Sequence, residues 1–397
     1  MCKLLYLAPA PVTLGFLRGQ AAYMSHRDLS ICAISSPGPE LEAFATSEHA
    51  RVRSIAMSRS ISPLRDIVSI IRLTRALRQE RPQILHANTS KGGLLGTIAG
   101  RLAGVPIIVY HNRGLPDFAG SRARRSLLRL AERLSGALAT QIFCVSHMAR
   151  EEAVRSGLWQ ESKSVVFLGG SGNGVDSGGR FNPEFVSAEA RAKLRASYAI
   201  PEDALVIGFV GRLANFKGLR EIDEAWRLIR NSHPHARLML VGSLDEVDPI
   251  SPELLKAFED DPRIILTGAL PDVTKAYPCF DVVAFSTYRE GLPNVPLETG
   301  AMMLPIVATR IPGCMEAVRD GETGFLVPPR NGSALAEAIV KYLDDATLRR
   351  THGEAAREFI KENFRQEAIW QEVYRTYEQL LVRRGLPLPH SNLVYSQ

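Results

Sequence analysis

Short apolar runs alternate with longer amphipathic segments along most of the chain. In the first half such runs occupy residues 3–9, 29–35, 52–57, 83–89, 106–111, 142–146 and 164–169. In the second half they occupy residues 204–211, 237–242, 263–268, 281–286, 305–309 and 324–328. Runs of this length, separated by helical segments of ten or more residues, predict parallel strands joined by crossover helices. The pattern therefore predicts an α/β chain with two tandem, doubly wound, Rossmann-like domains.

The segments between these runs predict helices, and one stretch interrupts the alternation. The clearest predicted helices cover residues 63–80, 92–103, 121–138, 147–156 and 366–384. Residues 169–180 are rich in glycine, which is typical of a turn or linker. We therefore predict a first domain at residues 1–180, completed by the helix at 366–384, a second domain at 181–365 and a tail at 385–397.

The composition agrees with two globular domains. The chain has 397 residues, more than one hydrophobic core usually supports, and 45% of them are hydrophobic. No apolar run approaches the roughly 18 to 20 residues that span a bilayer, and the first residues resemble a strand more than a signal sequence. We expect a cytoplasmic protein. The cysteines are scattered without a C-x-x-C pair, so we expect core residues and neither a disulfide frame nor a zinc site: Cys2, Cys32, Cys144, Cys279 and Cys314.

Charge is distributed unevenly between the two halves. Residues 1–180 carry 23 Lys and Arg against 12 Asp and Glu, whereas the remainder carries 25 against 30. A basic first half indicates an anionic partner. Nucleic acid is one candidate, but no zinc-finger, RNP or helix-turn-helix signature is present and aromatic residues make up only 7%. An anionic membrane surface or a phosphorylated acceptor fits better.

The densest candidate chemistry lies between Glu290 and Glu298. Glu290 follows the buried run at 281–286, and ligands bind at the carboxyl ends of parallel strands. Pro293 suits a first helical turn and Gly291 permits close approach of a ligand, so the N–H groups of Leu292, Asn294 and Val295 are expected to form an anion pocket. Glu298, farther along the helix, could accept hydrogen bonds from ribose hydroxyls. The alternative is that both acids are solvated surface residues.

Two cations follow the first apolar run of the second half. Arg212 and Lys217 lie beside Gly211 and Gly218 after the run at 204–211. Arginine can bind phosphate oxygens bidentately and lysine adds a point charge, so this loop could hold a diphosphate. The alternative is a pair of solvated loop cations. The loop is not a Walker motif, because G-x-x-x-x-G-K-[ST] is absent.

These motifs resemble the retaining, GT-B-fold glycosyltransferases of family 4. The resemblance is carried by GRL-x-x-x-KG at 211–218, E-G-x-P-x-x-x-x-E at 290–298 and G-x-x-E-A-V-x-x-G-x-x-G-x-L-V-P at 313–328. In the first half, ISPLRDIVSIIRL (61–73) and ILHANTSKGGLLGTIAGRLAGVP (84–106) are similar to the subgroup that extends polyprenyl-diphosphate-linked glycans.

The resemblance implies roles for the second-half residues, with an interdomain cleft between the two domains. Arg212 and Lys217 would hold the donor diphosphate, with the backbone around Gly211 and after Gly291 nearby. Glu290 would hold sugar hydroxyls near the reacting centre, and Glu298 would bind the ribose. No metal or other cofactor is expected, since a D-x-D motif is absent and fixed cations would stabilise the leaving diphosphate.

In the first half the family pattern is only partly kept. Many relatives have adjacent glycines after the first strand, whereas this chain has only Gly15 there, which is our candidate for donor contact. Many relatives also place a histidine against the donor sugar after the run at 106–111. Here His111 is our catalytic candidate, and Arg113 could replace it or bind the acceptor diphosphate. The candidate acceptor residues lie at neighbouring strand ends, although a structural role is equally open for them: His86, Asn88, Ser90, Lys91 and Arg113.

The predicted helix at 121–138 is basic and amphipathic. It carries one stripe of arginines and one stripe of leucines: Arg122, Arg125, Arg129 and Arg133, and Leu127, Leu130, Leu134 and Leu138. Such a helix can lie on anionic lipid. The ordinary alternative is that the leucines face the core and the arginines face water.

We expect an enzyme that moves a hexose or N-acetylhexosamine from a nucleotide-diphosphate sugar, most simply a UDP-sugar, to a polyprenyl-diphosphate-linked saccharide. We expect it in the cytoplasm, with peripheral contact at the inner membrane face and no nucleic acid partner. One alternative is a glycosyltransferase with a soluble small-molecule acceptor. Another is a non-catalytic nucleotide-sugar-binding protein. Donor sugar, acceptor and linkage depend on loop shapes that the sequence does not specify.

Overall fold

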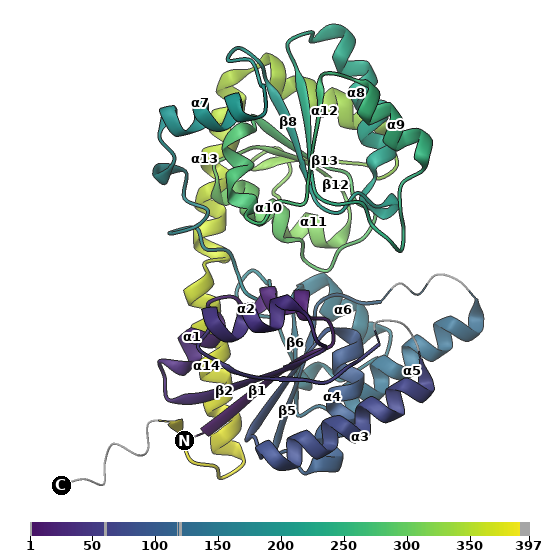
Figure 1. The fold of residues 1–397 in the computed structure, drawn as a ribbon, viewed down its shortest axis with the longest axis vertical. Coiled ribbons are helices and arrows are strands. Elements are labelled where there is room, and N and C mark those ends of the chain that lie inside the picture. The colour runs from purple at the N-terminus through teal and green to yellow at the C-terminus, as the bar shows by residue number, and fades with distance from the viewer. Residues whose placement is uncertain (1, 59–61, 117, 119–120, 390–397) are drawn as a thin grey trace, which may run out of the picture. The chain divides into compact units, whose positions relative to one another are not determined.

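The computed structural model describes residues 2–58, 62–116, 118 and 121–389, and they form two compact units (Figure 1). Unit 1 comprises Met1–Asn173 and Glu367–Gln397, and unit 2 comprises Gly174–Gln366. The division falls before the predicted junction after residue 180. Val175 already belongs to unit 2, because it pairs with Arg365 and its N–H donates to the carbonyl of Phe364 at 2.9 Å. The predicted tail lies outside the described residues from position 390 onward.

The sheet of unit 1 is parallel. Among the described residues it contains seven strands in the order β3-β2-β1-β4-β5-β6-β7. These strands are β1 (Cys2–Ala8), β2 (Leu29–Ser35), β3 (Arg51–Ser54), β4 (Ile84–Asn88), β5 (Ile107–Asn112), β6 (Gln141–Cys144) and β7 (Ser164–Val165). The order reverses at β1, next to β4, and such a reversal is where doubly wound sheets bind ligands.

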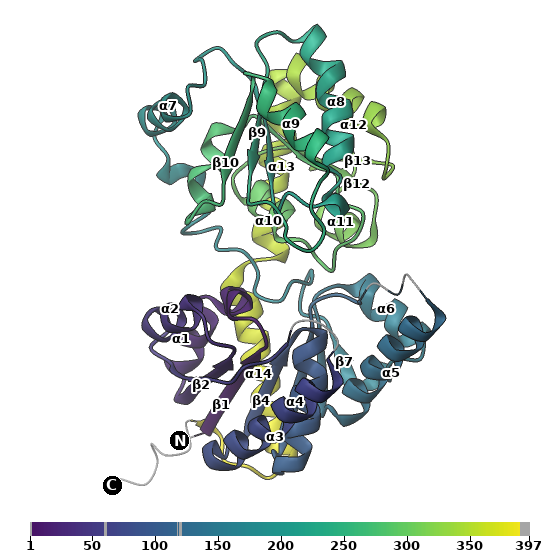
Figure 2. The ribbon, with the colours of Figure 1, turned by 45° about the vertical axis from the view of Figure 1, so that its right-hand side comes forward.

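Helices cover both faces of this sheet (Figure 1, Figure 2). The helices are α1 (Gln20–Ser25), α2 (Pro39–Ser47), α3 (Pro63–Glu80), α4 (Thr89–Ala103), α5 (Arg122–Leu138), α6 (His147–Arg155) and α14 (Gln366–Arg383), with 3-10 turns at Pro11–Leu17 and Glu161–Lys163. One core joins the sheet to α1, α2 and α14, and another joins it to α3 and α4. Helix α14 therefore completes the core of unit 1 although it lies at the far end of the chain.

Unit 2 repeats the architecture with a smaller parallel sheet. Its described residues form six strands in the order β10-β9-β8-β11-β12-β13. These strands are β8 (Val206–Val210), β9 (Arg237–Val241), β10 (Ile264–Gly268), β11 (Val282–Phe285), β12 (Ile306–Thr309) and β13 (Gly324–Val327). The reversal here lies between β8 and β11, so the loops after these two strands occupy the expected ligand position.

The helices of unit 2 follow its strands in alternation. They are α7 (Ala188–Ser197), α8 (Leu219–Ser232), α9 (Pro252–Asp260), α10 (Asn294–Ala301), α11 (Pro312–Ala317), α12 (Gly332–Asp344) and α13 (Ala346–Asn363), with 3-10 turns at Pro183–Phe185, Asn215–Lys217, Val273–Lys275 and Tyr277–Cys279. Helices α8 and α12 pack together over one face of the sheet, where Trp226 is fully buried.

The prediction of two Rossmann-like α/β domains is confirmed, and the differences lie mainly at the edges of the first sheet. The run at 164–169 forms a strand only over Ser164–Val165, and the run at 52–57 forms one at Arg51–Ser54. Both are edge strands with a neighbour on one side only, so less backbone pairing holds them extended. Helix α4 begins at Thr89, three residues before the predicted start.

Two smaller expectations can be checked in the described residues. All five cysteines are buried and unpaired, as expected for core residues. None of the described helices combines the length and apolar character that crossing a membrane would require.

Candidate functional site

The loop after β8 carries the two predicted cations of unit 2. Gly211 has φ +151 and Gly218 has φ +69, both in the region that favours glycine. A side chain on Gly218 would overlap the carbonyl of Ser286, so this loop lies directly against the end of β11. The sequence thus brings the ends of two neighbouring strands together, as expected from the sheet order.

Lys217 and Glu290 meet at this junction. Lys217 Nζ lies 2.5 Å from Glu290 Oε1, and the two side chains are only 14% and 16% exposed. Thr287 donates a second hydrogen bond to the same carboxylate oxygen at 3.0 Å. Two of the residues predicted for one site are therefore in direct contact, although they are far apart in the sequence.

Three cationic side chains lie around the ring of Phe216. The charged groups of Arg212, Lys217 and Arg289 lie 5.5, 5.2 and 5.3 Å from the ring centroid. Arg212 also pairs with the buried carboxylate of Asp245. The three cations give unit 2 a compact positive cluster next to Glu290. Sequence reasoning missed Arg289 and Asp245, although the position of Arg289 directly before Glu290 was an available signal.

The predicted helix start after Glu290 is present, with one correction. Pro293 is the N-cap residue and α10 begins at Asn294, so Pro293 does not occupy the first turn. Leu292 and Pro293 are buried, whereas Asn294 is exposed and Val295 is half-buried. A side chain on Gly313 would overlap the carbonyl oxygen of Gly291, which fixes the loop closely against α11. The first N–H groups of α10 have no partner within the helix and are available to an anion.

Glu298 has a different environment from Glu290. Its carboxylate accepts a hydrogen bond from the Tyr277 hydroxyl at 2.6 Å. Burial raises the pKa of Glu298, while the bond from Tyr277 and the charge of Arg180 oppose that rise. One oxygen of this carboxylate is thus already occupied, and the other remains for a ligand hydroxyl.

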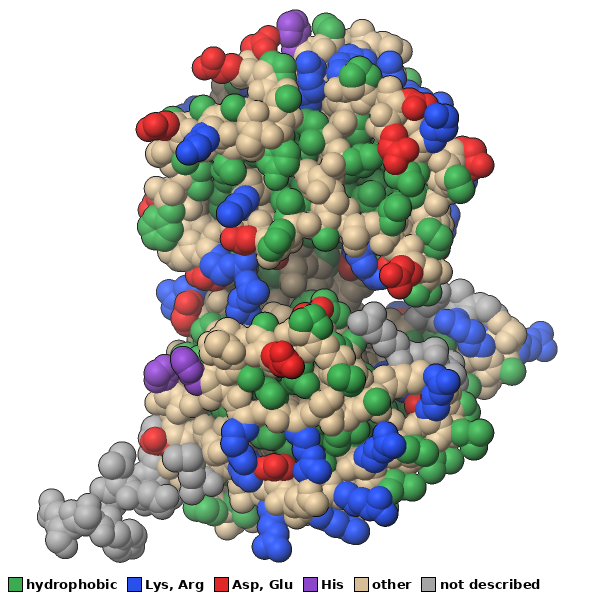
Figure 3. Space-filling model, viewed as in Figure 1, with side chains coloured by type: hydrophobic (Ala, Val, Ile, Leu, Met, Phe, Trp, Pro, Cys, Tyr) green, Lys and Arg blue, Asp and Glu red, His purple; other side chains and the backbone are tan. Residues whose placement is uncertain are grey.

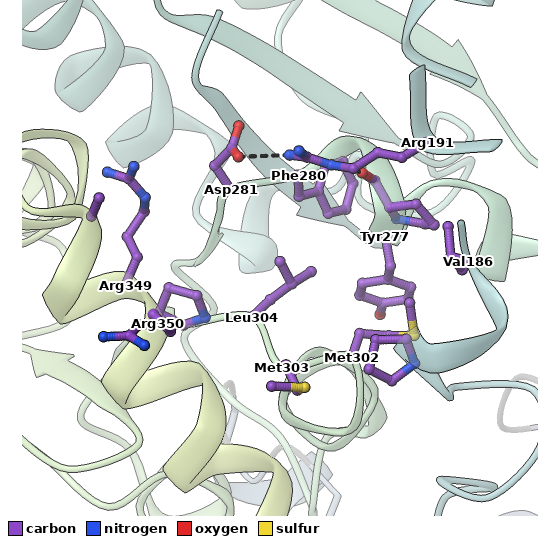
Figure 4. A pocket seen from close by; sticks show the side chains of 14 residues that line it. Val186, Arg191, Tyr277, Phe280, Asp281, Met302, Met303, Leu304, Arg349 and Arg350 are labelled. Carbon is purple, nitrogen blue, oxygen red and sulfur yellow. Dashed lines mark hydrogen bonds and ion pairs between the residues drawn. The ribbon is translucent and has the colours of Figure 1, made fainter. Parts of the chain in front are cut away.

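A separate pocket of about 390 Å³ opens at the other end of the same sheet (Figure 4). Asp281 and Pro305, which directly precede β11 and β12, contribute to its lining, and Asp281 pairs with Arg191 at 2.8 Å. Met302, Met303 and Leu304 also line it (Figure 4). Since doubly wound sheets bind ligands at the carboxyl ends of their strands, this pocket is not our candidate donor site.

In unit 1 the two candidate histidines are in contact. His86 Nε2 lies 2.9 Å from His111 Nδ1, and His86 Nδ1 is hydrogen-bonded to the hydroxyl of Tyr377 on α14. Both rings are buried, with His86 at the middle of β4 and His111 next to the last residue of β5. Burial, with the charge of Arg113, lowers the pKa of both histidines well below the ordinary value, so they are neutral at pH 7.

Arg113 and Asn88 join the same cluster. Arg113 donates from Nη2 to Asn88 Oδ1 at 2.9 Å, and its guanidinium packs against Gly172. A Cβ atom on Gly172 would overlap this guanidinium. His86, Asn88, His111 and Arg113 therefore form one group. Sequence reasoning missed Tyr377, because it comes from a helix almost 300 residues away from β4.

The remaining candidates of unit 1 are placed elsewhere. Ser90, in the first turn of α4, is hydrogen-bonded to the buried pair of Tyr110 and Glu132. Lys91 forms an ion pair with Asp66 of α3 at 2.5 Å. Gly15 lies in the 3-10 turn after β1, where a Cβ atom would meet nothing within 4 Å. None of these three makes a described contact with the cluster around His111.

Two family models match the chain. One, described as "Glycosyl transferases group 1", matches residues 204–345, and one, described as "Glycosyl transferase 4-like domain", matches residues 16–169. The chain is similar to the capsular polysaccharide biosynthesis glycosyltransferase CapM of Staphylococcus aureus, with 30% identity over 96% of this chain and 97% of that one. It is also similar, at 26% identity over 74% of each chain, to the UDP-Gal:alpha-D-GlcNAc-diphosphoundecaprenol alpha-1,3-galactosyltransferase of Escherichia coli.

Solved structures share the fold. Anabaena HepE in complex with UDP and glucose matches with a TM-score of 0.78 and 21% identity, covering 95% of this chain and all of that one. Sucrose-phosphate synthase from Thermosynechococcus elongatus matches with a TM-score of 0.79 and 19% identity, over 96% of this chain and all of that one. With two Rossmann-like units and a relative of 30% identity over nearly its whole length, the chain belongs to the group 1 glycosyltransferases of family 4, which have the GT-B fold.

Proposed function

We propose that this glycosyltransferase moves a hexose or N-acetylhexosamine from a UDP-sugar to a polyprenyl-diphosphate-linked saccharide during surface polysaccharide synthesis, with retention of configuration. The observation that carries the proposal is the contact of Lys217 with Glu290, with Arg212 and Arg289 as further cations around Phe216. The acceptor class is supported by the two relatives, one named for capsular polysaccharide biosynthesis and one for a diphosphoundecaprenol substrate.

On the donor side, unit 2 would bind the diphosphate with cations and backbone N–H groups. Arg212, Lys217 and Arg289 supply positive charge, and the start of α10 adds N–H groups with the favourable end of the helix dipole. Glu290 would accept hydrogen bonds from sugar hydroxyls, and Glu298 from the ribose. The cation cluster is suited to stabilise charge that develops on the leaving diphosphate, without a metal ion.

The transfer step would use the leaving group as the base. The acceptor hydroxyl oxygen bonds to the anomeric carbon while the bond from that carbon to the diphosphate oxygen breaks. The proton of the hydroxyl passes to the departing phosphate oxygen on the same face of the sugar. Neither Glu290 nor Glu298 is assigned as nucleophile, because one is paired with Lys217 and the other is hydrogen-bonded to Tyr277.

Glu290→Gln tests this assignment. The substitution keeps the size of the side chain but removes the charge that Lys217 and a sugar hydroxyl need, so we expect kcat to fall at least about 100-fold. Turnover is measured by release of UDP in the presence of a lipid-linked acceptor. Glu221→Gln is the matched control, because Glu221 is also buried and receives a hydrogen bond from Tyr288 at 2.6 Å. Near-normal turnover in Glu290→Gln would remove Glu290 from the site.

We also propose that unit 1 contacts an anionic membrane surface through α5. This helix buries Glu132, Ser135 and Gly136, while Leu127 and Leu130 are 47% and 63% exposed. Leu134 is exposed as well and Leu138 is half-buried, so one face of α5 does lie on the core, but it is not the leucine stripe. Helix α3 has exposed apolar residues as well, including Leu64 at 81% exposed. Basic and hydrophobic side chains lie side by side over both helices (Figure 3), as in helices that bind anionic lipid.

A further inference from the structure

A row of buried polar side chains crosses the interior of unit 1 and ends at His111. Gln20 Oε1 lies 3.3 Å from the Tyr6 hydroxyl, and Tyr6 is hydrogen-bonded to Tyr377. Tyr377 is hydrogen-bonded to His86 Nδ1, and His86 Nε2 lies 2.9 Å from His111 Nδ1. All five side chains lie within unit 1, and none of them takes part in the transfer step described above.

The hydrogens along such a row must all point the same way. A tyrosine hydroxyl carries one hydrogen and a neutral imidazole carries one N–H, so each member can donate once. Tyr6 donates its single hydrogen to Gln20 Oε1, so it can only accept from Tyr377. Tyr377 must then accept from His86 Nδ1, and His86 Nε2 must accept from His111 Nδ1. The Nε2 atom of His111 is left with a lone pair.

The other end of the row favours the same direction. Arg113 lies beside His111 Nε2: a Cβ atom on Gly172 would overlap the Arg113 guanidinium and stand 3.2 Å from that ring nitrogen. A guanidinium offers only donors. In the reversed row, His111 would carry a hydrogen on Nε2 next to these donors and no described residue would accept it. The cation therefore stabilises a lone pair on Nε2.

We propose that Gln20, Tyr6, Tyr377 and His86 are positioning residues that hold His111 in the Nδ1–H tautomer. His111 Nε2 then acts as a hydrogen-bond acceptor beside the donors of Arg113. A substrate hydroxyl fits this pair, because it can donate to Nε2 and accept from Arg113 at once. The tautomer of a histidine is set by the hydrogen-bond partner of its other ring nitrogen. For His111 this partner is His86, which is linked to Gln20 through Tyr377 and Tyr6.

The tautomer can be measured directly in the full-length protein. Long-range proton–nitrogen correlation spectra of histidine-labelled protein distinguish a protonated ring nitrogen from one with a lone pair. We expect both His86 and His111 to be neutral with the hydrogen on Nδ1 at pH 7. A hydrogen on Nε2 of His111 would overturn the proposal without any variant being needed.

Tyr6→Phe tests the relay. The change removes the group to which the Tyr377 hydroxyl donates. That hydroxyl can then donate to His86 Nδ1 instead, so both histidines should change to the Nε2–H form. Tyr342→Phe is the matched control, since Tyr342 lies 2.7 Å from His352 Nδ1 in a buried pair of unit 2. It removes the same hydroxyl and should leave the spectra of His86 and His111 unchanged. Unchanged tautomers in folded Tyr6→Phe would overturn the relay.

The link from the relay to sugar transfer rests on the proposed function. If His111 accepts a hydrogen bond from a substrate hydroxyl, Tyr6→Phe should lower kcat/KM about tenfold, the usual effect of one hydrogen bond. The Tyr342→Phe control should keep its kcat/KM. The spectra need no turnover, so they test the relay even if the proposed reaction is wrong. A changed tautomer with unaltered kcat/KM would remove His111 from substrate binding.

Discussion

At the scale of residues, Glu290 and Glu298 have the same charged group in opposite surroundings. Glu290 forms an ion pair with the ammonium of Lys217. Glu298 has a tyrosine hydroxyl as its contact, and burial raises its pKa. This difference supports separate roles in donor binding over a shared acid–base role. In the proposed function, Glu290 would bind a sugar hydroxyl and Glu298 a ribose hydroxyl.

The buried histidines make the stability of unit 1 dependent on pH. Burial lowers the pKa of His86 and of His111 in the folded state, so below pH 6.5 the unfolded chain binds more protons than the folded one. Their contribution is present above pH 6.5 and is lost as the pH falls. Between pH 7.5 and 5.5 the free energy of unfolding should fall by about 2 to 3 kcal/mol because of this pair.

Urea denaturation at the two pH values measures this fall. The double variant His86→Asn/His111→Asn should show a pH dependence smaller by that amount, whatever its absolute stability. His147→Asn, which changes an exposed histidine, should keep the dependence of the parent chain. An equal dependence in the parent and the double variant would contradict neutral histidines at these positions.

The positions of site residues were more predictable than their contacts. Lys217 and Glu290 could be predicted together because each follows a buried strand and carboxyl ends of neighbouring strands meet. Tyr277 and Tyr377 could not, because no local pattern shows that a tyrosine hydroxyl will reach a carboxylate or imidazole across the core. Their partners depend on packing between elements that are distant in sequence.

At the scale of elements, the close contact between the carbonyl of Gly291 and Gly313 fixes the position of the start of α10. Gly313→Ala would place a methyl group against the carbonyl oxygen of Gly291 and 3.2 Å from Pro293 Cδ. The loop must move, so the N–H groups of α10 lose their position. We expect UDP affinity to fall about tenfold and stability to fall by about 1 to 3 kcal/mol, as for other overpacked sites.

Isothermal titration with UDP and thermal unfolding measure the two effects. Gly178→Ala is the control, because a Cβ atom there meets nothing within 4 Å and the residue lies in the same unit. That variant should bind UDP as the parent chain does. Parent-like affinity in Gly313→Ala would show that the position of this loop is not needed for nucleotide binding.

The orientation of α5 shows where an element-scale prediction fails. The sequence specifies a helix with a leucine stripe and an arginine stripe, and a hydrophobic stripe ordinarily faces the core. Instead, Tyr110 donates to Glu132 at 2.8 Å, and this polar contact is buried together with Ser135. The face of α5 that turns inward is thus the one that carries a hydrogen bond to a strand, and the periodicity of the sequence does not reveal such a contact.

At the scale of the whole molecule, the charge follows the two units. Unit 1 carries 25 Lys and Arg against 14 Asp and Glu, and unit 2 carries 23 against 28. The excess of positive charge therefore lies on the unit that also exposes the leucines of α5. Long-range attraction to anionic lipid and short-range apolar contact would act on the same unit. Binding to neutral vesicles should be much weaker.

Removing the arginines of α5 tests this membrane contact. Four residues are changed to glutamine together: Arg122, Arg125, Arg129 and Arg133. Each basic residue near an anionic surface contributes about 1 kcal/mol, so vesicle binding should fall by a factor on the order of 100 to 1,000. The measurement is flotation with vesicles of anionic lipid. Turnover should fall with an acceptor embedded in vesicles and remain unchanged with a water-soluble acceptor analogue.

The control is an equal change of charge on unit 2, at four exposed positions: Arg227, Lys256, Arg319 and Arg350. If binding depended only on net charge, both quadruple variants would lose it equally. Because α5 combines cations with exposed leucines, we expect only the α5 variant to lose flotation. Flotation of the α5 variant at the level of the parent chain would show that this helix does not contact lipid, and the exposed leucines would need another partner.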